Sequence, residues 1–287
     1  MSAARLARRL PGRRAFITGG ASGLGFALAS QLAAAGWTLA LLDREAERLP
    51  AARDTLLAAG ALAVHGYVAD VTDEAAFGAA LQSFVAATGG LDLMINNAGV
   101  AVAGSVAATP IADWRWALEI NVIGVAIGCR LALPVMARGN GGLVINIASA
   151  AAFAAGPGMA AYNASKAAVL ALTETLAAEY DDGRIRALVA MPGFFPTRLL
   201  DTMRAPPEAL GFARRMMDRS PFTADSVAAR ILAAAAAGRL HVVVPPGYAR
   251  LWLLKRLMPV FFVRWMSRQR ARGAQRRARG GGSTERT

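Results

Sequence analysis

Three side chains suited to proton transfer lie within one short stretch, Ser149 to Lys166. Tyr162 and Lys166 are four residues apart at the start of an apolar, helix-forming run, a spacing that places phenol and ammonium on one helical face. An ammonium near a phenol favours the phenolate, so the pair predicts a pKa for Tyr162 below its ordinary value of about 10. We interpret Tyr162 as an acid and base toward a substrate, with Ser149, thirteen residues before it, hydrogen-bonding the same substrate oxygen.

The surrounding elements decide whether Tyr162 and Lys166 are such a pair or an ordinary surface Tyr and Lys. Apolar strands are predicted at residues 14–18, 37–43, 61–68, 91–95, 143–147, 185–189 and 240–244. Helices are predicted from the turn at 19–25 to about 35, and at 44–59, 73–88, 111–138 (kinked or ended near Pro134), 159–180 and 224–237. This alternation predicts an α/β fold, a doubly wound parallel seven-stranded sheet with helices on both faces and right-handed crossovers.

A glycine-rich turn joins the first strand to the first helix. Glycines at 19, 23 and 25 allow a tight turn and a close approach of the backbone to a pyrophosphate, which would lie at the positive end of the following helix. Asp43 ends the second strand, twenty-four residues after Gly19. A glycine turn between strand and helix, followed by such an acid, is typical of dinucleotide binding.

Asp43 and Arg44 bear on which dinucleotide binds. A carboxylate at Asp43 accepts hydrogen bonds from both ribose hydroxyls and repels a 2′-phosphate, which favours NAD. Arg44 is able to pair with a 2′-phosphate, so NADP remains the alternative, although residues 20–22 of the turn include no basic side chain. Asp43 is also placed to cap the helix that follows it.

Four signatures in order now give a resemblance to a known family. They are the turn Thr18–Gly25, the run Asn96–Gly99, the set Ser149, Tyr162 and Lys166, and Pro192-Gly193 with Thr197. With them, residues 11–245 resemble the short-chain dehydrogenase/reductase family of the Rossmann type. The resemblance implies hydride exchange between C4 of a nicotinamide and the carbon of a secondary alcohol or ketone.

The resemblance also implies roles for single residues. Tyr162 takes or gives the hydroxyl proton, Ser149 hydrogen-bonds the substrate oxygen, Lys166 lowers the pKa of Tyr162 and binds the nicotinamide ribose, and Asn121 binds a water that links Lys166 to solvent. Asn121 is instead a polar residue on a solvated face if the resemblance misleads. The catalytic set is therefore Asn121, Ser149, Tyr162 and Lys166, with no metal.

The cofactor site implied by the resemblance includes residues at or after the ends of the first four predicted strands. Asp70-Val71 is expected at the adenine, unless Asp70 only caps the next helix; Asn97 to Gly99 lines the cofactor and stabilises the sheet; Thr197 holds the carboxamide. The full set is Gly19, Ala21, Ser22, Gly23, Leu24, Gly25, Asp43, Arg44, Asp70, Val71, Asn97, Ala98, Gly99, Tyr162, Lys166, Pro192, Gly193 and Thr197.

The segments beyond the carboxyl ends of the strands should bind the substrate. They are 100–108, 150–159, 194–195 and 199–219, and their large side chains are nearly all apolar: Val100, Val102, Phe153, Met159, Phe194, Phe195, Leu199, Met203, Leu210 and Phe212. We expect Phe153, Met159, Phe194 and Phe195 to contact a hydrophobic alcohol or ketone. Four arginines in these segments either meet an acidic group of the substrate or form a solvated face: Arg204, Arg214, Arg215 and Arg219.

The formal charge of +13 is concentrated at the ends of the chain. We divide the chain into a basic N-terminal segment (1–11), the Rossmann-fold domain (12–247), a basic amphipathic extension (248–268) and a disordered Arg/Gly-rich tail (269–287). Pro259 should split the extension into two short helices. They either lie on an anionic membrane surface or pack on their own domain or a sister subunit and cover the substrate pocket.

Other features address location and alternative functions. The single Cys129 fits a reducing compartment, and the first fourteen residues contain no long apolar run, which together predict a cytoplasmic protein, peripheral at the inner face of the membrane if the extension binds lipid. We expect a homodimer or homotetramer and no specific nucleic acid, because no aromatic residues interleave with the Arg-rich tail. The alternatives are an NADP-dependent carbonyl reductase of the same family and a non-catalytic dinucleotide-sensing protein.

Overall fold

The sheet is the core of the computed structural model, which describes residues 2–180 and 183–268. Within those residues it has seven strands, all parallel, in the order β3-β2-β1-β4-β5-β6-β7. The strands are β1 Arg14–Thr18, β2 Thr38–Asp43, β3 Ala63–Val68, β4 Leu93–Asn96, β5 Gly142–Ile147, β6 Ile185–Pro192 and β7 His241–Val244. The predicted parallel, doubly wound sheet is confirmed, and its strand order reverses between β1 and β4, where such sheets bind ligands.

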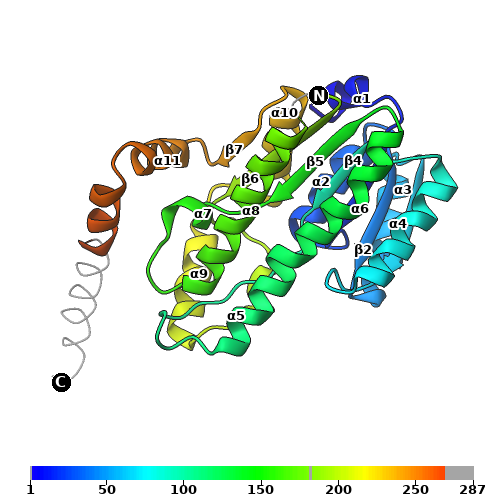
Figure 1. The fold of residues 1–287 in the computed structure, drawn as a ribbon. Helices are drawn as coiled ribbons and strands as arrows, with labels where there is room; N and C mark the ends of the chain where they lie inside the picture. The colour runs from blue at the N-terminus through cyan, green and yellow to red at the C-terminus, as the bar shows by residue number, and fades with distance from the viewer. Residues whose placement is uncertain (1, 181–182, 269–287) are drawn as a thin grey trace.

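Helices cover both faces of the sheet, and each face has its own apolar core (Figure 1). One face packs against α1 Ser2–Arg9, α2 Gly23–Ala33, α3 Leu49–Ala58 and α10 Ala224–Ala236. The other packs against α4 Glu74–Thr88, α5 Ile111–Leu118, α6 Gly124–Arg138 and α8 Ala160–Glu179. Strands buried on both faces explain why the sequence shows continuous apolar runs rather than alternation.

Two predicted helices differ from the structure. The helix expected from residue 44 begins only at Leu49, after a short 3-10 turn, Ala46–Arg48. The long helix does not end at Pro134, which lies inside α6; its irregularity is instead a π-helical segment, η2, at Glu119–Ile123. A π segment shifts the hydrogen-bond ladder by one residue and is frequent at functional sites.

The N-terminal segment forms a helix that the sequence analysis did not predict. Helix α1 buries Ala3, Leu6 and Ala7 and continues into buried Leu10, while Arg5 stays exposed. These apolar positions follow the i, i+3, i+4, i+7 pattern of one helical face. The basic residues of this segment therefore lie on the solvent side of a helix that belongs to the main core.

Among the described residues, one helical run, Ile111–Arg138, has the length and the apolar composition needed to cross a membrane. It comprises α5, η2 and α6, and buries Ile120, Val125 and Ile127 in the core on one face of the sheet. Core helices of this kind satisfy the same criterion.

The C-terminal extension consists of α11, Gly247–Leu257, and a second helix over residues 259–268, with the break at Met258 (Figure 1). The helical periodicity of residues 248–258 predicts one apolar face, with Leu251, Leu254, Leu257 and Met258 opposite Lys255 and Arg256, and this prediction is partly wrong. Leu251 and Leu254 are half-buried, but Leu257 is exposed, and Lys255 is half-buried with its Nζ 5.7 Å from the ring centroid of Phe262. The predicted disordered tail, 269–287, lies outside the described residues.

Candidate active site

A cavity of about 1130 Å³ lies at the carboxyl ends of the strands, across the point where the strand order reverses. Its lining comes from the segments that follow β1 through β6 and from the C-terminal extension. Pockets for single small ligands have volumes of roughly 300–1000 Å³, so this space is large enough for a cofactor together with a substrate.

The glycine turn forms one end of this cavity. Gly19 and Gly23 have φ values of +60° and +54°, in the left-handed region that favours glycine. A Cβ on Gly25 would lie 2.1 Å from the carbonyl oxygen of Gly19, so no side chain fits there. Ser22 is the N-cap of α2 but its side chain makes no capping hydrogen bond. The start of α2 therefore presents its amides to the cavity without a competing side-chain acceptor from that residue.

Asp43 is fixed in place by two backbone amides. Its Oδ2 accepts from the N–H of Ala21 and its Oδ1 from the N–H of Glu45, each at 3.1 Å. The carboxylate thus faces the glycine turn from the end of β2, and Arg44 is exposed beside it at the rim of the cavity. A carboxylate and a guanidinium side by side at this position leave binding of NAD and binding of NADP both chemically possible.

Asn97 holds the ends of β1 and β4 together. Its Nδ2 donates to the carbonyl oxygens of Thr18 and Gly19, each at 3.0 Å, while the Thr18 hydroxyl accepts from the N–H groups of Asn97 and Ala98. Asn97, Ala98 and Gly99 also line the cavity. This network fixes the distance between the glycine turn and the centre of the site.

Asn121 lies in η2 and is fully buried. Its Oδ1 accepts from the N–H of Val100 at 2.8 Å, and its Nδ2 donates to the carbonyl of Val100 at 2.9 Å and to Oγ of Ser165 at 3.0 Å. A Cβ on Gly99 would lie 3.0 Å from Asn121 Oδ1 and 3.3 Å from Lys166 Nζ, so the amide and the ammonium lie near each other. The side chain orients the loop after β4 and does not line the cavity, and the solvated-face alternative is wrong.

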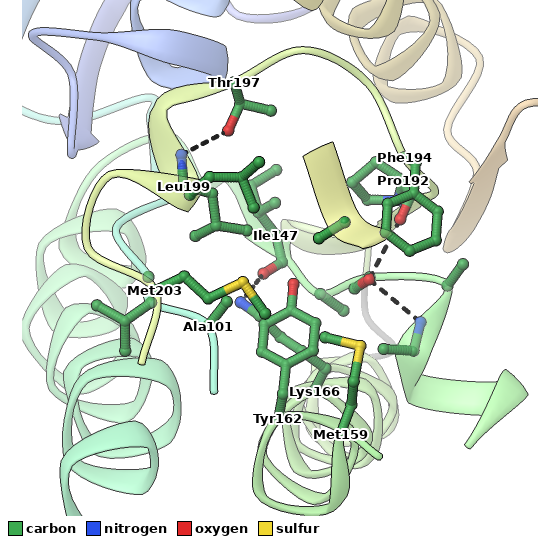
Figure 2. Close-up of a pocket in the computed structure, with 18 of the residues that line it drawn as sticks. Ala101, Ile147, Met159, Tyr162, Lys166, Pro192, Phe194, Thr197, Leu199 and Met203 are labelled. Carbon is green, nitrogen blue, oxygen red and sulfur yellow. Dashed lines mark hydrogen bonds between the residues drawn. The ribbon is translucent and has the colours of Figure 1, made fainter. Parts of the chain in front are cut away.

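Tyr162 and Lys166 lie in the first turns of α8, with Ser149 opposite them after β5. Tyr162 is 7% exposed and Lys166 is 3% exposed. Lys166 Nζ donates to the carbonyl of Ile147 at 3.0 Å and lies 5.9 Å from the centroid of the Tyr162 ring. Figure 2 shows the Tyr162 hydroxyl directed into the space between Phe194 and Met203.

Ser149 is held by the backbone. Its hydroxyl donates to the carbonyl of Pro192 at 3.3 Å and accepts from the N–H of Ala151 at 3.1 Å. These contacts place the hydroxyl at the cavity wall, where it acts on the pKa of Tyr162. The end of β5 and the start of α8 therefore present two hydroxyls to one region of the cavity.

Burial dominates the electrostatics of this cluster. It raises the pKa of Tyr162 above its ordinary value, an effect that the Ser149 hydroxyl partly offsets, and it lowers the pKa of Lys166 to about 8. The predicted lowering of the Tyr162 pKa is thus wrong. A low-dielectric site disfavours both charged forms, and the Lys166 ammonium donates to Ile147 rather than to the phenol oxygen.

The substrate end of the cavity is mostly apolar, and its polar lining residues include Arg198, Asp201, Thr202 and Glu208. Phe153, in α7 Ala151–Ala154, lines it together with Met159, Phe194 and Phe195. Beyond them come η3 Arg198–Leu200, capped by Thr197 through the N–H of Leu199 at 2.8 Å, and α9 Pro207–Asp218. Further apolar side chains on these elements line the cavity: Leu199, Leu200, Met203, Phe212 and Met217.

Some predicted site residues do not line the cavity. Ala21 and Gly25 lie behind the glycine turn, where Ala21 contributes its N–H to Asp43 and Gly25 allows α2 to approach Gly19. Val102 packs with Ala117 and Ala161 in a separate small core, and Leu210 lies off the cavity on α9. The other cofactor and substrate residues predicted from the sequence line one continuous space.

The sequence analysis missed the contacts of Arg204 and left open whether the C-terminal extension covers the pocket. Arg204 holds the segment 199–219, here called the substrate segment, against α5. Its Nη1 lies 2.8 Å from Asp113 Oδ1, and its guanidinium carbon lies 3.9 Å from the centroid of the Trp116 ring. Its backbone forms hydrogen bonds with residues 101 and 103. The C-terminal extension also contributes to the cavity wall, through Tyr248, Leu251, Phe262, Trp265 and Met266. The spacing of the last three is typical of one helical face, a signal present in the sequence.

The fold and the site define a class of protein: a nucleotide-binding α/β oxidoreductase with a Tyr and Lys pair above the switch point of its sheet. The model of the family described as short chain dehydrogenase matches residues 13–208. The chain therefore belongs to the short-chain dehydrogenase family and is an NAD(P)-dependent oxidoreductase.

Individual relatives show the range of alcohols that this family handles. The chain is 35% identical over 238 residues to 2-(R)-hydroxypropyl-CoM dehydrogenase of Xanthobacter autotrophicus, covering 78% of this chain and 95% of the relative. It is 36% identical over 216 residues to 3beta-hydroxysteroid dehydrogenase 1 of Eggerthella lenta, covering 72% and 80%. Their names describe chemically different alcohols, so likeness alone does not choose the substrate.

Solved structures agree with the fold. A short chain dehydrogenase/reductase from Burkholderia phymatum in complex with NAD matches with a TM-score of 0.81 at 32% identity, covering 85% of this chain and 92% of that one. Levodione reductase matches with a TM-score of 0.73 at 30% identity, covering 83% and 98%. The sheet order and the helices on both faces are therefore those of this family.

Proposed function

We propose that the protein transfers a hydride between NAD(H) and a hydrophobic secondary alcohol or ketone. The observation that carries the proposal is the buried Tyr162 hydroxyl, beside Ser149 and Lys166, in a cavity whose substrate end is mostly apolar. In the oxidative direction the alcohol gives a hydride and a proton, and the products are a ketone, NADH and a proton. The bound dinucleotide would supply the hydride acceptor at C4 of its nicotinamide.

Tyr162 is the proton donor and acceptor in this proposal. Its raised pKa keeps the hydroxyl protonated at neutral pH, which suits donation to a ketone oxygen. Alcohol oxidation requires the hydroxyl to lose that proton, so higher pH should favour oxidation. Ser149 donates a second hydrogen bond to the same oxygen by turning its one O–H away from the carbonyl of Pro192, and this bond stabilises the charge that develops on the oxygen.

Lys166 and Asn121 position the dinucleotide and the proton donor. Lys166 donates one hydrogen bond to Ile147, and an ammonium has three N–H donors, so two are available for the nicotinamide ribose. Asn121 holds the loop after β4 through Val100, close to the ammonium. Its proposed water link from Lys166 to solvent is carried over from the family.

The residues around the glycine turn fit a dinucleotide. Gly25 has no room for a side chain, and the start of α2 suits a pyrophosphate. Asp43 faces the turn and favours NAD, because its carboxylate binds ribose hydroxyls and repels a 2′-phosphate. Arg44 at the rim supports the second candidate, an NADP-dependent carbonyl reductase.

We also propose partners for two surfaces. Exposed Ile111 and Ile123, on α5 and η2, support a contact between subunits of a homodimer or homotetramer. Basic and apolar side chains of residues 248–268 support contact with an anionic membrane at the cytoplasmic face. A non-catalytic dinucleotide sensor is the weakest candidate, because Tyr162 and Lys166 are both present and both line the cavity.

The substitution Tyr162→Phe tests this proposal. Removing one general acid and base should lower turnover about a thousandfold, while quenching of protein fluorescence by NADH remains close to that of the wild type. Tyr180→Phe, which changes a tyrosine at the far end of α8, is the matched control and should keep full activity. An active Tyr162→Phe protein would remove the mechanism.

A further inference from the structure

The second helix of the extension, residues 259–268, has two opposite apolar faces. Its inner face lines the cavity through Phe262, Trp265 and Met266, and Phe262 has no exposed surface. The Met266 Cε lies 3.9 Å from the position that a Cβ on Gly156 would occupy, so this helix reaches the loop between α7 and α8. The inner face therefore belongs to the wall of the substrate site.

The outer face is exposed and continues onto the end of α11. Its apolar side chains have exposed fractions of 72% for Leu257, 50% for Met258, 63% for Val260, 49% for Phe261 and 50% for Val263. Figure 1 shows the two helices beyond β7, at the edge of the protein. Adjoining exposed apolar residues of this kind mark an interaction surface.

The charge of the extension indicates which partner binds the outer face. Residues 247–268 contain five cations, Arg250, Lys255, Arg256, Arg264 and Arg268, and no acidic residue. A second copy docking through a twofold contact would bring the same cations against one another. An anionic bilayer supplies both an apolar phase and the opposite charge, and short basic helices with aromatic side chains suit its interface.

We propose that residues 247–268 dock on an anionic membrane through the outer face, so that a secondary alcohol or ketone dissolved in the bilayer enters the cavity past the inner face. The inference rests on the proposed function for its chemistry and identifies the substrate class as lipid-soluble. Its basis is that one helix carries both faces, so a single helix separates the bilayer from the substrate site.

Vesicle co-sedimentation tests the docking step. The full chain is mixed with vesicles of equal parts phosphatidylcholine and phosphatidylglycerol, or of phosphatidylcholine alone. We expect the wild type to pellet with the anionic vesicles, and the triple variant Val260→Ser, Phe261→Ser, Val263→Ser to bind at least about tenfold more weakly, because it loses buried apolar area. Leu57→Ser with Leu62→Ser changes exposed residues near the opposite sheet edge and is the matched control.

Turnover of two alcohols tests the entry route. With NAD⁺ and a long-chain secondary alkanol in anionic vesicles, the triple variant should lose about tenfold in rate, whereas secondary butanol in solution should be oxidised at the wild-type rate. The substituted residues do not line the cavity, so oxidation of the water-soluble alcohol should be unaffected. Should no alcohol be turned over by any variant, the proposed function fails, while the sedimentation result still decides the docking.

Three results would overturn the inference. One is equal pelleting of the wild type and the triple variant, since the basic tail is the same in both and its charge would then account for binding. Another is absence of pelleting by the wild type. The third is a change of oligomeric state in the triple variant by light scattering, which would make the outer face a subunit interface.

Discussion

The two ends of the cavity are built on different principles. At the dinucleotide end, backbone and short polar side chains are joined by hydrogen bonds near 3.0 Å, as between Asn97 and the turn after β1. At the substrate end, the lining is mostly apolar side chains on short helices, and Arg204 links two segments through an ion pair with Asp113. Directional bonds fix one ligand shape, whereas an apolar wall accepts a range of shapes.

This difference explains how a family with one cofactor class acts on many alcohols. The dinucleotide end lies on strand ends that share one sheet, so a shift of one group disturbs several hydrogen bonds. The substrate end lies on η3, α9 and the C-terminal extension, where each side chain can change with little effect on the sheet. Lys166 lies at the boundary between the two ends of the cavity, where burial lowers the pKa of its ammonium group.

The largest expected effect concerns that boundary. Folded Lys166 loses its proton at about pH 8, whereas the ordinary value is 10.5, so between these values the unfolded chain binds more protons. The free energy of unfolding of the wild type, relative to Lys166→Met, should therefore rise by roughly 3 kcal/mol as the pH increases through this window. Urea denaturation of the ligand-free protein at several pH values measures it.

The matched control for Lys166→Met is Lys255→Met, which changes the other lysine of the chain. A difference between the wild type and Lys166→Met that stays flat from pH 8 to 10.5 would contradict burial of the ammonium.

A smaller effect is expected at the dinucleotide end. Asp43→Ser removes the carboxylate that faces the glycine turn, and with it the hydrogen bonds that we propose to the ribose and the repulsion of a 2′-phosphate. The ratio of kcat/KM for NAD⁺ over NADP⁺ should fall at least about tenfold, since hydrogen bonds to a charged group contribute about 1.5–3 kcal/mol. Arg44→Ala should move the ratio the other way. An unchanged ratio in both variants would exclude this edge as the selectivity site.

The smallest effect is expected at the substrate end. Arg204→Ala removes a half-exposed ion pair with Asp113 and the stacking on Trp116, which together contribute about 1 kcal/mol. We expect KM for the alcohol to rise about threefold to fivefold with little change in kcat, because the substrate segment becomes less ordered. Arg214→Ala on α9 is the control. A loss confined to kcat would show that Arg204 acts on the chemistry instead.

The sheet and the glycine turn were predictable because their signals are local. Apolar strands buried on both faces leave continuous runs, and the turn needs glycine where the backbone has positive φ or α2 approaches Gly19. Helix α1 was also readable from its Ala3, Leu6, Ala7 pattern, but its many arginines suggested a loose basic segment.

The parts of the site that were not predictable depend on contacts distant in sequence. Arg204 meets Asp113 across 91 residues, and no local pattern announces that pair. The pKa of Tyr162 depends on how deeply α8 is buried, which the four-residue spacing to Lys166 does not reveal. Val102 and Leu210 were apolar in the right segments, yet which way a loop residue points depends on the packing around it.

A series of secondary alkanols of increasing chain length tests the central claim most directly. With NAD⁺ in excess, kcat/KM for the wild type should rise about fourfold per added methylene until the cavity is filled, because each buried methylene contributes about 0.8 kcal/mol. A constant or falling kcat/KM along the series, or faster oxidation of a polyol of equal carbon number, would contradict a hydrophobic alcohol or ketone as the substrate.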